Sequence, residues 1–156
     1  MTKEKSVDAL ITKLRERVKE QNLKNTTQRE VIIRAMFKHK GHFTPEEILG
    51  FTQKEEGGKN IGIATVYRAL NFFEQEGFVV SISFGADGKR YELNVKEHHD
   101  HMICDECEKI IEFESDEIEK LQEAEAAKKG FLIKDHAMQL HGICKECQQK
   151  EKGKTR

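Results

Sequence analysis

The sequence lacks any long apolar run, and no stretch approaches the ~18 residues that a membrane-spanning helix needs. Its first ten residues carry Lys3, Glu4, Lys5 and Asp8 and no apolar core, so they do not resemble a signal peptide. Both absences favour a protein that works in the cytoplasm.

Motifs of hydrolytic and phosphate-transferring enzymes are also missing. The sequence has no H-E-x-x-H, no G-x-S-x-G and no glycine-rich phosphate loop. Its 156 residues are few for the larger metallohydrolase folds. We therefore expect no catalytic residues. A metal-dependent hydrolase remains an alternative, which turnover of ester or nucleotide substrates would support.

Cysteine is absent from the first 103 residues, and all four cysteines follow in two C-x-x-C pairs, Cys104 with Cys107 and Cys144 with Cys147. In a reducing compartment, two such pairs indicate a four-thiolate zinc site. Four thiolates leave no open position on the metal, so this zinc is expected to be structural. Two disulfides or four free thiols are the alternatives.

Charge is distributed unevenly along the chain. Residues 1–97 contain 17 Lys and Arg against 14 Asp and Glu, whereas residues 98–156 contain 10 against 14. This weak asymmetry is compatible with a DNA-facing first half and a cation-binding second half.

Apolar spacing predicts four helices in the first half, at about residues 7–21, 27–38, 45–54 and 63–76. Two capping boxes support these starts, one from Thr27 to Glu30 and one from Thr44 to Glu47. Two short strands joined by a turn at Asp87 follow. This order is that of a winged helix-turn-helix, although periodicity alone leaves an unspecialised α+β domain equally open.

The second half predicts strands around the first cysteine pair, a helix from Ser115 to Gly130, a strand over residues 131–143 and a disordered tail from about Gln148. We therefore expect an α+β protein with residues 1–96 as a winged-helix DNA-binding domain, 97–148 as a metal-binding domain and 149–156 as a tail.

Four successive possible metal ligands occur at residues 98–101 (HHDH). Side chains alternate along an extended strand, so His98 and Asp100 would face one way and His99 and His101 the other. The run therefore predicts two separate metal sites. A solvated linker is the alternative.

Residues 60–78 contain the candidate recognition helix. Ile63, Val66 and Leu70 are expected to pack inward. Thr65, Tyr67 and Arg68 lie near the end that meets base edges in a major-groove helix. Taken alone, this segment is more readily explained as an ordinary amphipathic helix.

Together these features resemble the ferric uptake regulator family over roughly residues 10–147. The resemblance rests on residues 62–70 (GIATVYRAL), on residues 91–93 (YEL) before the histidine run, and on the first cysteine pair leading to residues 111–113 (IEF). It implies a C-terminal dimerisation domain, a homodimer that binds operator DNA, and metal loading that brings the winged helices into a DNA-binding arrangement. Lys24 resembles a lysine of the family that enters the minor groove.

The resemblance also implies three sets of metal ligands. The structural zinc would be held by Cys104, Cys107, Cys144 and Cys147. The regulatory metal would be held by His42, Glu92, His99, His101 and Glu112. An additional divalent metal would be held by His98, Asp100, Glu119 and His136.

Nitrogen and oxygen ligands with carboxylates suit Fe²⁺ or Mn²⁺, although Zn²⁺ can bind them more tightly in vitro. Zinc-responsive members typically use a further cysteine, and peroxide sensors typically have Asp at the position of Glu112. An Fe²⁺-dependent repressor of iron-uptake and iron-homeostasis genes is therefore the first expectation. A zinc-, manganese- or peroxide-responsive member is the alternative. A metal storage or delivery protein would leave the helix-turn-helix without a role.

Overall fold

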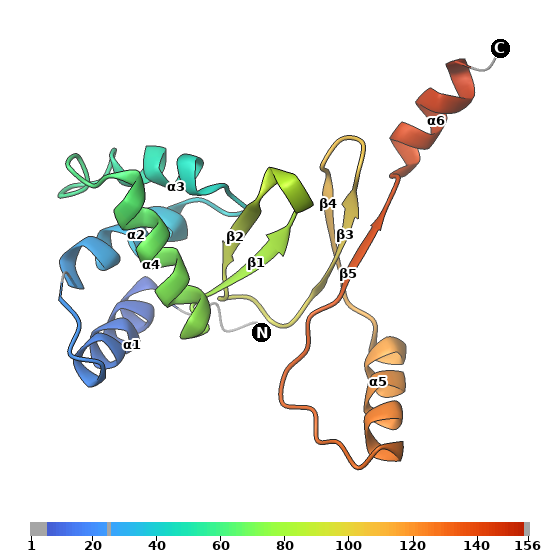
Figure 1. The fold of residues 1–156 in the computed structure, drawn as a ribbon, viewed down its shortest axis with the longest axis horizontal. Coiled ribbons are helices and arrows are strands. Elements are labelled where there is room, and N and C mark those ends of the chain that lie inside the picture. The colour runs from blue at the N-terminus through green and yellow to red at the C-terminus, as the bar shows by residue number, and fades with distance from the viewer. Residues whose placement is uncertain (1–5, 25, 155–156) are drawn as a thin grey trace. The chain divides into compact units, whose positions relative to one another are not determined.

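The computed structural model describes residues 6–24 and 26–154 (Figure 1). The chain divides into two compact units, Met1–Lys96 and Glu97–Arg156. Within the described residues, no helix is both long enough and apolar enough to cross a membrane.

Helices make up most of the first unit. They are α1 (Val7–Glu20), α2 (Thr26–Lys38), α3 (Pro45–Thr52) and α4 (Ile63–Gln75). The capping box predicted at Thr44 is confirmed: its hydroxyl accepts from the Glu47 N–H, and the Glu47 carboxylate accepts from the Thr44 N–H. The other predicted box is wrong. Helix α2 begins at Thr26, so Thr27 lies inside the helix and cannot cap it.

The core of the first unit is shared by all four helices. Helix α1 contributes Leu10, Ile11, Leu14 and Val18, as its spacing predicts. Val66 and Leu70 of α4 are completely buried, as expected. Ile63 is not, since 36% of it is exposed. It is the first residue of α4 and lies beyond the edge of the core.

A β-hairpin follows the helices. Strands β1 (Val79–Ser83) and β2 (Lys89–Leu93) pair antiparallel, with Val79 opposite Leu93. Between them lies the short helix η1 (Gly85–Asp87), and the turn ends at Gly88 with a φ of 86°, which glycine adopts at little cost. Helices followed by this hairpin form the winged helix predicted from the sequence.

The second unit is a three-stranded sheet with two helices. Its elements are β3 (Asp100–Cys104), β4 (Ile110–Phe113), α5 (Asp116–Lys128), β5 (Gln139–Gly142) and α6 (Lys145–Lys154). The strand order is β4-β3-β5, in which β3 pairs antiparallel with β4 and parallel with β5. The Ser115 hydroxyl caps α5 by accepting from the Ile118 N–H. The mixed α+β fold class is therefore confirmed.

Two expectations for the second unit are wrong. The strand predicted over residues 131–143 is only four residues long, because the chain from Phe131 to Met138 runs without regular structure alongside α5 (Figure 1). The tail is helical up to Lys154 rather than disordered from Gln148. Its Lys, Glu and Gln residues are good helix formers, and α6 starts inside the second cysteine pair.

Candidate metal centres and nucleic-acid interface

The four cysteines converge in the second unit. Cys104 ends β3, Cys107 lies in the following turn, Cys144 precedes α6 and Cys147 lies in its first turn. Their sulfur atoms all lie within 4.8 Å of one another, and Cys107 Sγ is 3.8 Å from Cys144 Sγ. A tetrahedral zinc with Zn–S bonds of about 2.3 Å separates its sulfurs by about 3.8 Å. All four cysteines have free thiols in the structure, and four sulfurs at these distances fit a tetrahedral zinc ion.

Charge within this cluster also favours a cation. Backbone N–H donors, above all that of Cys144, lower the pKa of the Cys104 thiol to about 6. Hydrogen bonds that the Cys147 thiol donates to the sulfurs of Cys144 and Cys107, together with burial, raise the pKa of Cys147 to about 12. A thiolate therefore forms more readily at Cys104 than at Cys147. A divalent cation would stabilise all four sulfurs as thiolates.

A second cluster lies at the start of β3. The Nε2 atom of His98 is 3.4 Å from Oδ1 of Asp100, and the rings of His98 and His136 are 4.0 Å apart. Within the described part of the chain, the buried Nε2 of His136 has no hydrogen-bond partner. An imidazole nitrogen left without a partner beside a histidine and a carboxylate fits a cation.

The fourth expected ligand of this cluster lies on α5. Glu119 lines an open cavity together with His98 and His136, but its carboxylate is not within the close grouping that those residues form with Asp100. Glu123, one helical turn further along, lines the same cavity. Glu123 was not among the ligands expected from the sequence, although a spacing of four residues places it on the same face of the helix as Glu119.

The five residues expected at the regulatory site belong to two different units. In the first unit, Nε2 of His42 lies 2.9 Å from Oε2 of Glu92, and both side chains are buried. A backbone bridge causes this contact: Phe43 and Tyr91 exchange hydrogen bonds of 3.0 and 2.8 Å, which brings the preceding His42 beside Glu92. The Glu92 carboxylate also forms an ion pair with Lys96, whose Nζ lies 3.2 Å from Oε1.

In the second unit, the rings of His99 and His101 are 4.8 Å apart, and Nε2 of His99 is 3.8 Å from Oε1 of Glu112. Strand pairing places Glu112 directly opposite His101. The histidine run therefore divides as the alternation argument predicts, with His98 and Asp100 in one group and His99 and His101 in the other.

Helix α4 presents the residues expected to contact DNA. Tyr67 is 43% exposed, and its hydroxyl donates to Oε1 of Glu46 on α3 at 3.1 Å, a contact that raises the pKa of Tyr67. Arg68 is exposed and donates from Nη2 to the hydroxyl of Thr65 at 3.1 Å. Both side chains are thus oriented by neighbours while remaining accessible.

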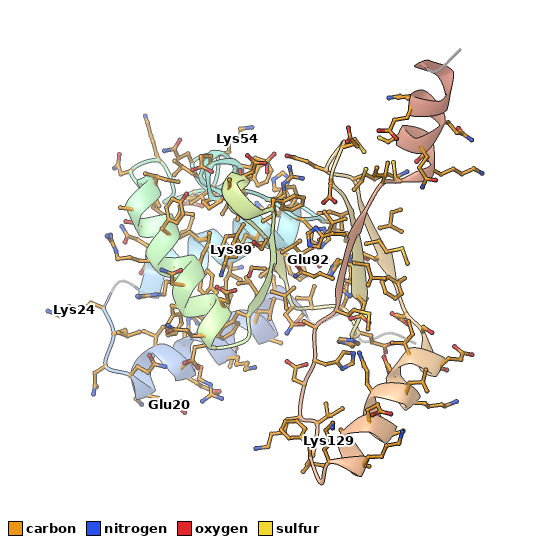
Figure 2. The ribbon with its side chains drawn as sticks, turned by 45° about the vertical axis from the view of Figure 1, so that its right-hand side comes forward. Glu20, Lys24, Lys54, Lys89, Glu92 and Lys129 are labelled. Carbon is orange, nitrogen blue, oxygen red and sulfur yellow. The ribbon has the colours of Figure 1, made fainter. Side chains whose placement is uncertain are left out.

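Lys24 lies at the surface on the loop between α1 and α2 (Figure 2). Its carbonyl oxygen accepts from Nη1 of Arg29 at 2.5 Å. Sequence reasoning missed Arg29, which sits in the first turns of α2 and contacts this loop. Its position five residues after Lys24, the candidate minor-groove lysine, could have drawn attention to it in the sequence.

Comparisons with known proteins agree with this arrangement. Residues 20–141 match the sequence profile of the ferric uptake regulator family. The ferric uptake regulation protein of Campylobacter jejuni is 46% identical over 140 residues, which cover 90% of this chain and 89% of that protein.

Two solved structures are also similar. The ferric uptake regulator of Helicobacter pylori, described as having three functional metal binding sites, has a TM-score of 0.81 at 38% identity and covers 95% of this chain and 97% of its own. The ferric uptake regulator of Francisella tularensis, solved with iron, has a TM-score of 0.67 at 37% identity. The match covers 81% of this chain and 95% of the Francisella tularensis chain. The chain belongs to the ferric uptake regulator family, whose members are metal-responsive transcription regulators.

Proposed function

We propose that this protein is an Fe²⁺-dependent transcriptional repressor that binds operator DNA as a homodimer in the cytoplasm and controls genes of iron uptake and homeostasis. One observation carries the proposal: a winged helix with an accessible, polar α4 surface occurs in the same chain as three groups of metal-ligating residues. Either feature alone would fit another class of protein, since a storage protein needs no winged helix and a constitutive DNA-binding protein needs no metal.

For DNA, the proposal assigns α4 to the major groove. Arg68 can grip a guanine or a phosphate, and Thr65 and Tyr67 can contact thymine methyl groups or phosphates. Lys24, on the loop before α2, would enter the adjacent minor groove. The exposure of Tyr67 and Arg68 and their fixed orientation support this assignment.

For the metals, the proposal assigns a structural Zn²⁺ to the four cysteines, supported by their mutual distances. The regulatory metal is assigned to His42 and Glu92 of the first unit together with His99, His101 and Glu112 of the second. Two carboxylates and three imidazoles suit Fe²⁺, and the Francisella tularensis relative was solved with iron. Mn²⁺ or Zn²⁺ would occupy the same ligands in vitro.

A further divalent metal is assigned to His98, Asp100, Glu119 and His136. The partnerless Nε2 of His136 supports this site. The Helicobacter pylori relative is described as having three functional metal binding sites, and three groups of ligands are assigned to this chain.

The homodimer is supported by an apolar row on the three-stranded sheet. Met102 of β3 lies opposite Ile111 of β4 and Leu140 of β5, and these side chains are 39%, 41% and 44% exposed. Three apolar residues in register across neighbouring strands form a surface that a second copy would cover.

Selection of duplexes from a random-sequence library tests the proposal. The full chain, with its zinc retained, is incubated anaerobically with Fe²⁺, Mn²⁺, Zn²⁺ or no added metal, and bound duplexes are sequenced. We expect enrichment of one palindromic sequence with Fe²⁺ and loss of it without metal. Metal binding without enrichment of any duplex would instead favour a storage or delivery protein, and enrichment with Zn²⁺ or Mn²⁺ alone would reassign the metal.

A further inference from the structure

The Arg29 guanidinium is held in place by two contacts. Its Nη1 donates to the Lys24 carbonyl at 2.5 Å, and its Cζ lies 5.1 Å from the centroid of the Phe72 ring on α4. Its Nε is buried and, among the residues that the structure describes, has no hydrogen-bond acceptor. The side chain thus joins the Lys24 loop to α4.

The charge on Arg29 is not neutralised by a carboxylate. Neither Arg29 nor Arg68 forms an ion pair within residues 6–24 and 26–154. Burial, and after it the positive charge of Arg68, lowers the pKa of Arg29. Helix α2 begins at Thr26 and has no acidic residue in its first turn, so its dipole adds positive potential at the same place. Two neighbouring cations without a counter-ion form a favourable position for an anion.

We propose that one phosphate of the DNA backbone binds between Arg29 and Arg68 and anchors the protein at the boundary between two grooves. This inference rests on the proposed function, which places Lys24 in the minor groove and α4 in the major groove. A phosphodiester strand always separates the two grooves, and Arg29 contacts both the Lys24 loop and α4. The phosphate would supply the counter-ion that the protein lacks and fix the register of α4 on the duplex.

The position of Arg29 also explains why the site should bind DNA without large rearrangement. The guanidinium is already packed against Phe72 and hydrogen-bonded to the loop, so little side-chain freedom remains to be lost. An arginine confined in this way is suited to hold a phosphate at a fixed distance from α4.

A walk of neutral methylphosphonate substitutions along the selected duplex tests the proposal with the Mn²⁺-loaded full chain. Affinities are measured for the wild type, Arg29→Gln, Arg29→Lys, and the control Arg34→Gln. Arg34 lies on the same helix, but its Nη1 is near Asp8 of α1, at 3.9 Å. Thermal unfolding verifies that each variant folds.

For the wild type, we expect a methylphosphonate at one position, placed in both half-sites of the palindrome, to weaken binding about tenfold, because each protomer loses a charge-assisted hydrogen bond. Arg29→Gln should weaken binding to the unmodified duplex by a similar factor and become insensitive to that substitution. Arg29→Lys should recover most of the affinity, because it keeps the charge, and Arg34→Gln should behave like the wild type.

If Arg29→Gln and each methylphosphonate weaken duplex affinity independently, so that their effects add at every position, the phosphate site is overturned. Arg29 would then have a purely structural role. Equal weakening by Arg29→Gln and Arg29→Lys would overturn it as well. In both cases the wild type still binds the selected duplex, so the proposed function stands. If the wild type selects no duplex at all, the proposed function fails and the phosphate site fails with it.

Discussion

A single pair of backbone hydrogen bonds decides where one candidate ligand lies. Phe43 follows a loop, and Tyr91 belongs to β2, yet their bridge brings His42 beside Glu92. Nothing in the periodicity of the sequence indicates such an isolated bridge, and only the resemblance to a family selected His42. The alternation of residues 98–101, in contrast, follows from strand geometry and could be predicted from the sequence directly.

The cysteine cluster gives the first prediction. Cys104→Ser or Cys144→Ser should lose the structural zinc and lower the melting temperature, because binding of a structural metal is part of the folding free energy. Metal content measured by mass spectrometry, together with thermal unfolding, checks this. A variant that lacks zinc but melts at the wild-type temperature would show that the cysteines are not a structural site.

The polar face of α4 gives the second prediction. Arg68→Ala and Tyr67→Ala should weaken binding to the selected duplex by about 5- to 150-fold, the range expected for a lost base contact. Zinc content and melting temperature should not change, since both side chains are exposed. Wild-type affinity in Arg68→Ala would remove α4 from the interface.

At the scale of elements, the sequence predicts the position of a helix best where a capping residue and the apolar periodicity indicate the same start. Helix α3 has a capping box and a proline at its start, and α5 begins after Ser115, so both could be located closely from the sequence. Strand β5 could not, because its short length is set by pairing with β3 rather than by its own residues. Helix α6 was missed because a polar composition is compatible with both a helix and a disordered tail.

The apolar row on the β4-β3-β5 sheet gives the third prediction. Met102→Glu should shift the protein from dimer to monomer, because a charge at the centre of a buried interface is not solvated. Sedimentation velocity provides the measurement. Val80→Glu is the matched control, since Val80 is 36% exposed on β1 of the first unit. A dimeric Met102→Glu variant would place the interface elsewhere.

At the scale of the whole molecule, the proposed regulatory site joins two units. His42 and Glu92 belong to the first unit, whereas His99, His101 and Glu112 belong to the second. A metal held by all five residues would favour the arrangement of the two units in which these residues meet. It shifts the population toward that arrangement only if it binds it more tightly than it binds an arrangement in which they are apart. For the metal to act as a co-repressor, this arrangement must also be the one that binds DNA.

The two groups in the histidine run give the fourth prediction. His99→Ala should abolish the effect of metal on duplex binding while retaining the structural zinc and the dimer. His98→Ala should have a smaller effect, because His98 lies with Asp100 and His136 in the other group. Duplex affinity measured against Fe²⁺ concentration compares the variants. A full metal response in His99→Ala would exchange the roles of the two sites.

In the proposed mechanism, metal binding and DNA binding favour the same arrangement of the two units. Thermodynamic linkage then makes the effect reciprocal: the factor by which Fe²⁺ tightens duplex binding must equal the factor by which the duplex tightens Fe²⁺ binding. The direct measurement is the Fe²⁺ affinity of the zinc-loaded protein, under anaerobic conditions, with and without the selected duplex. We predict that the duplex tightens Fe²⁺ binding by the same factor by which Fe²⁺ tightens duplex binding. An Fe²⁺ affinity that is identical with and without the duplex would contradict the account.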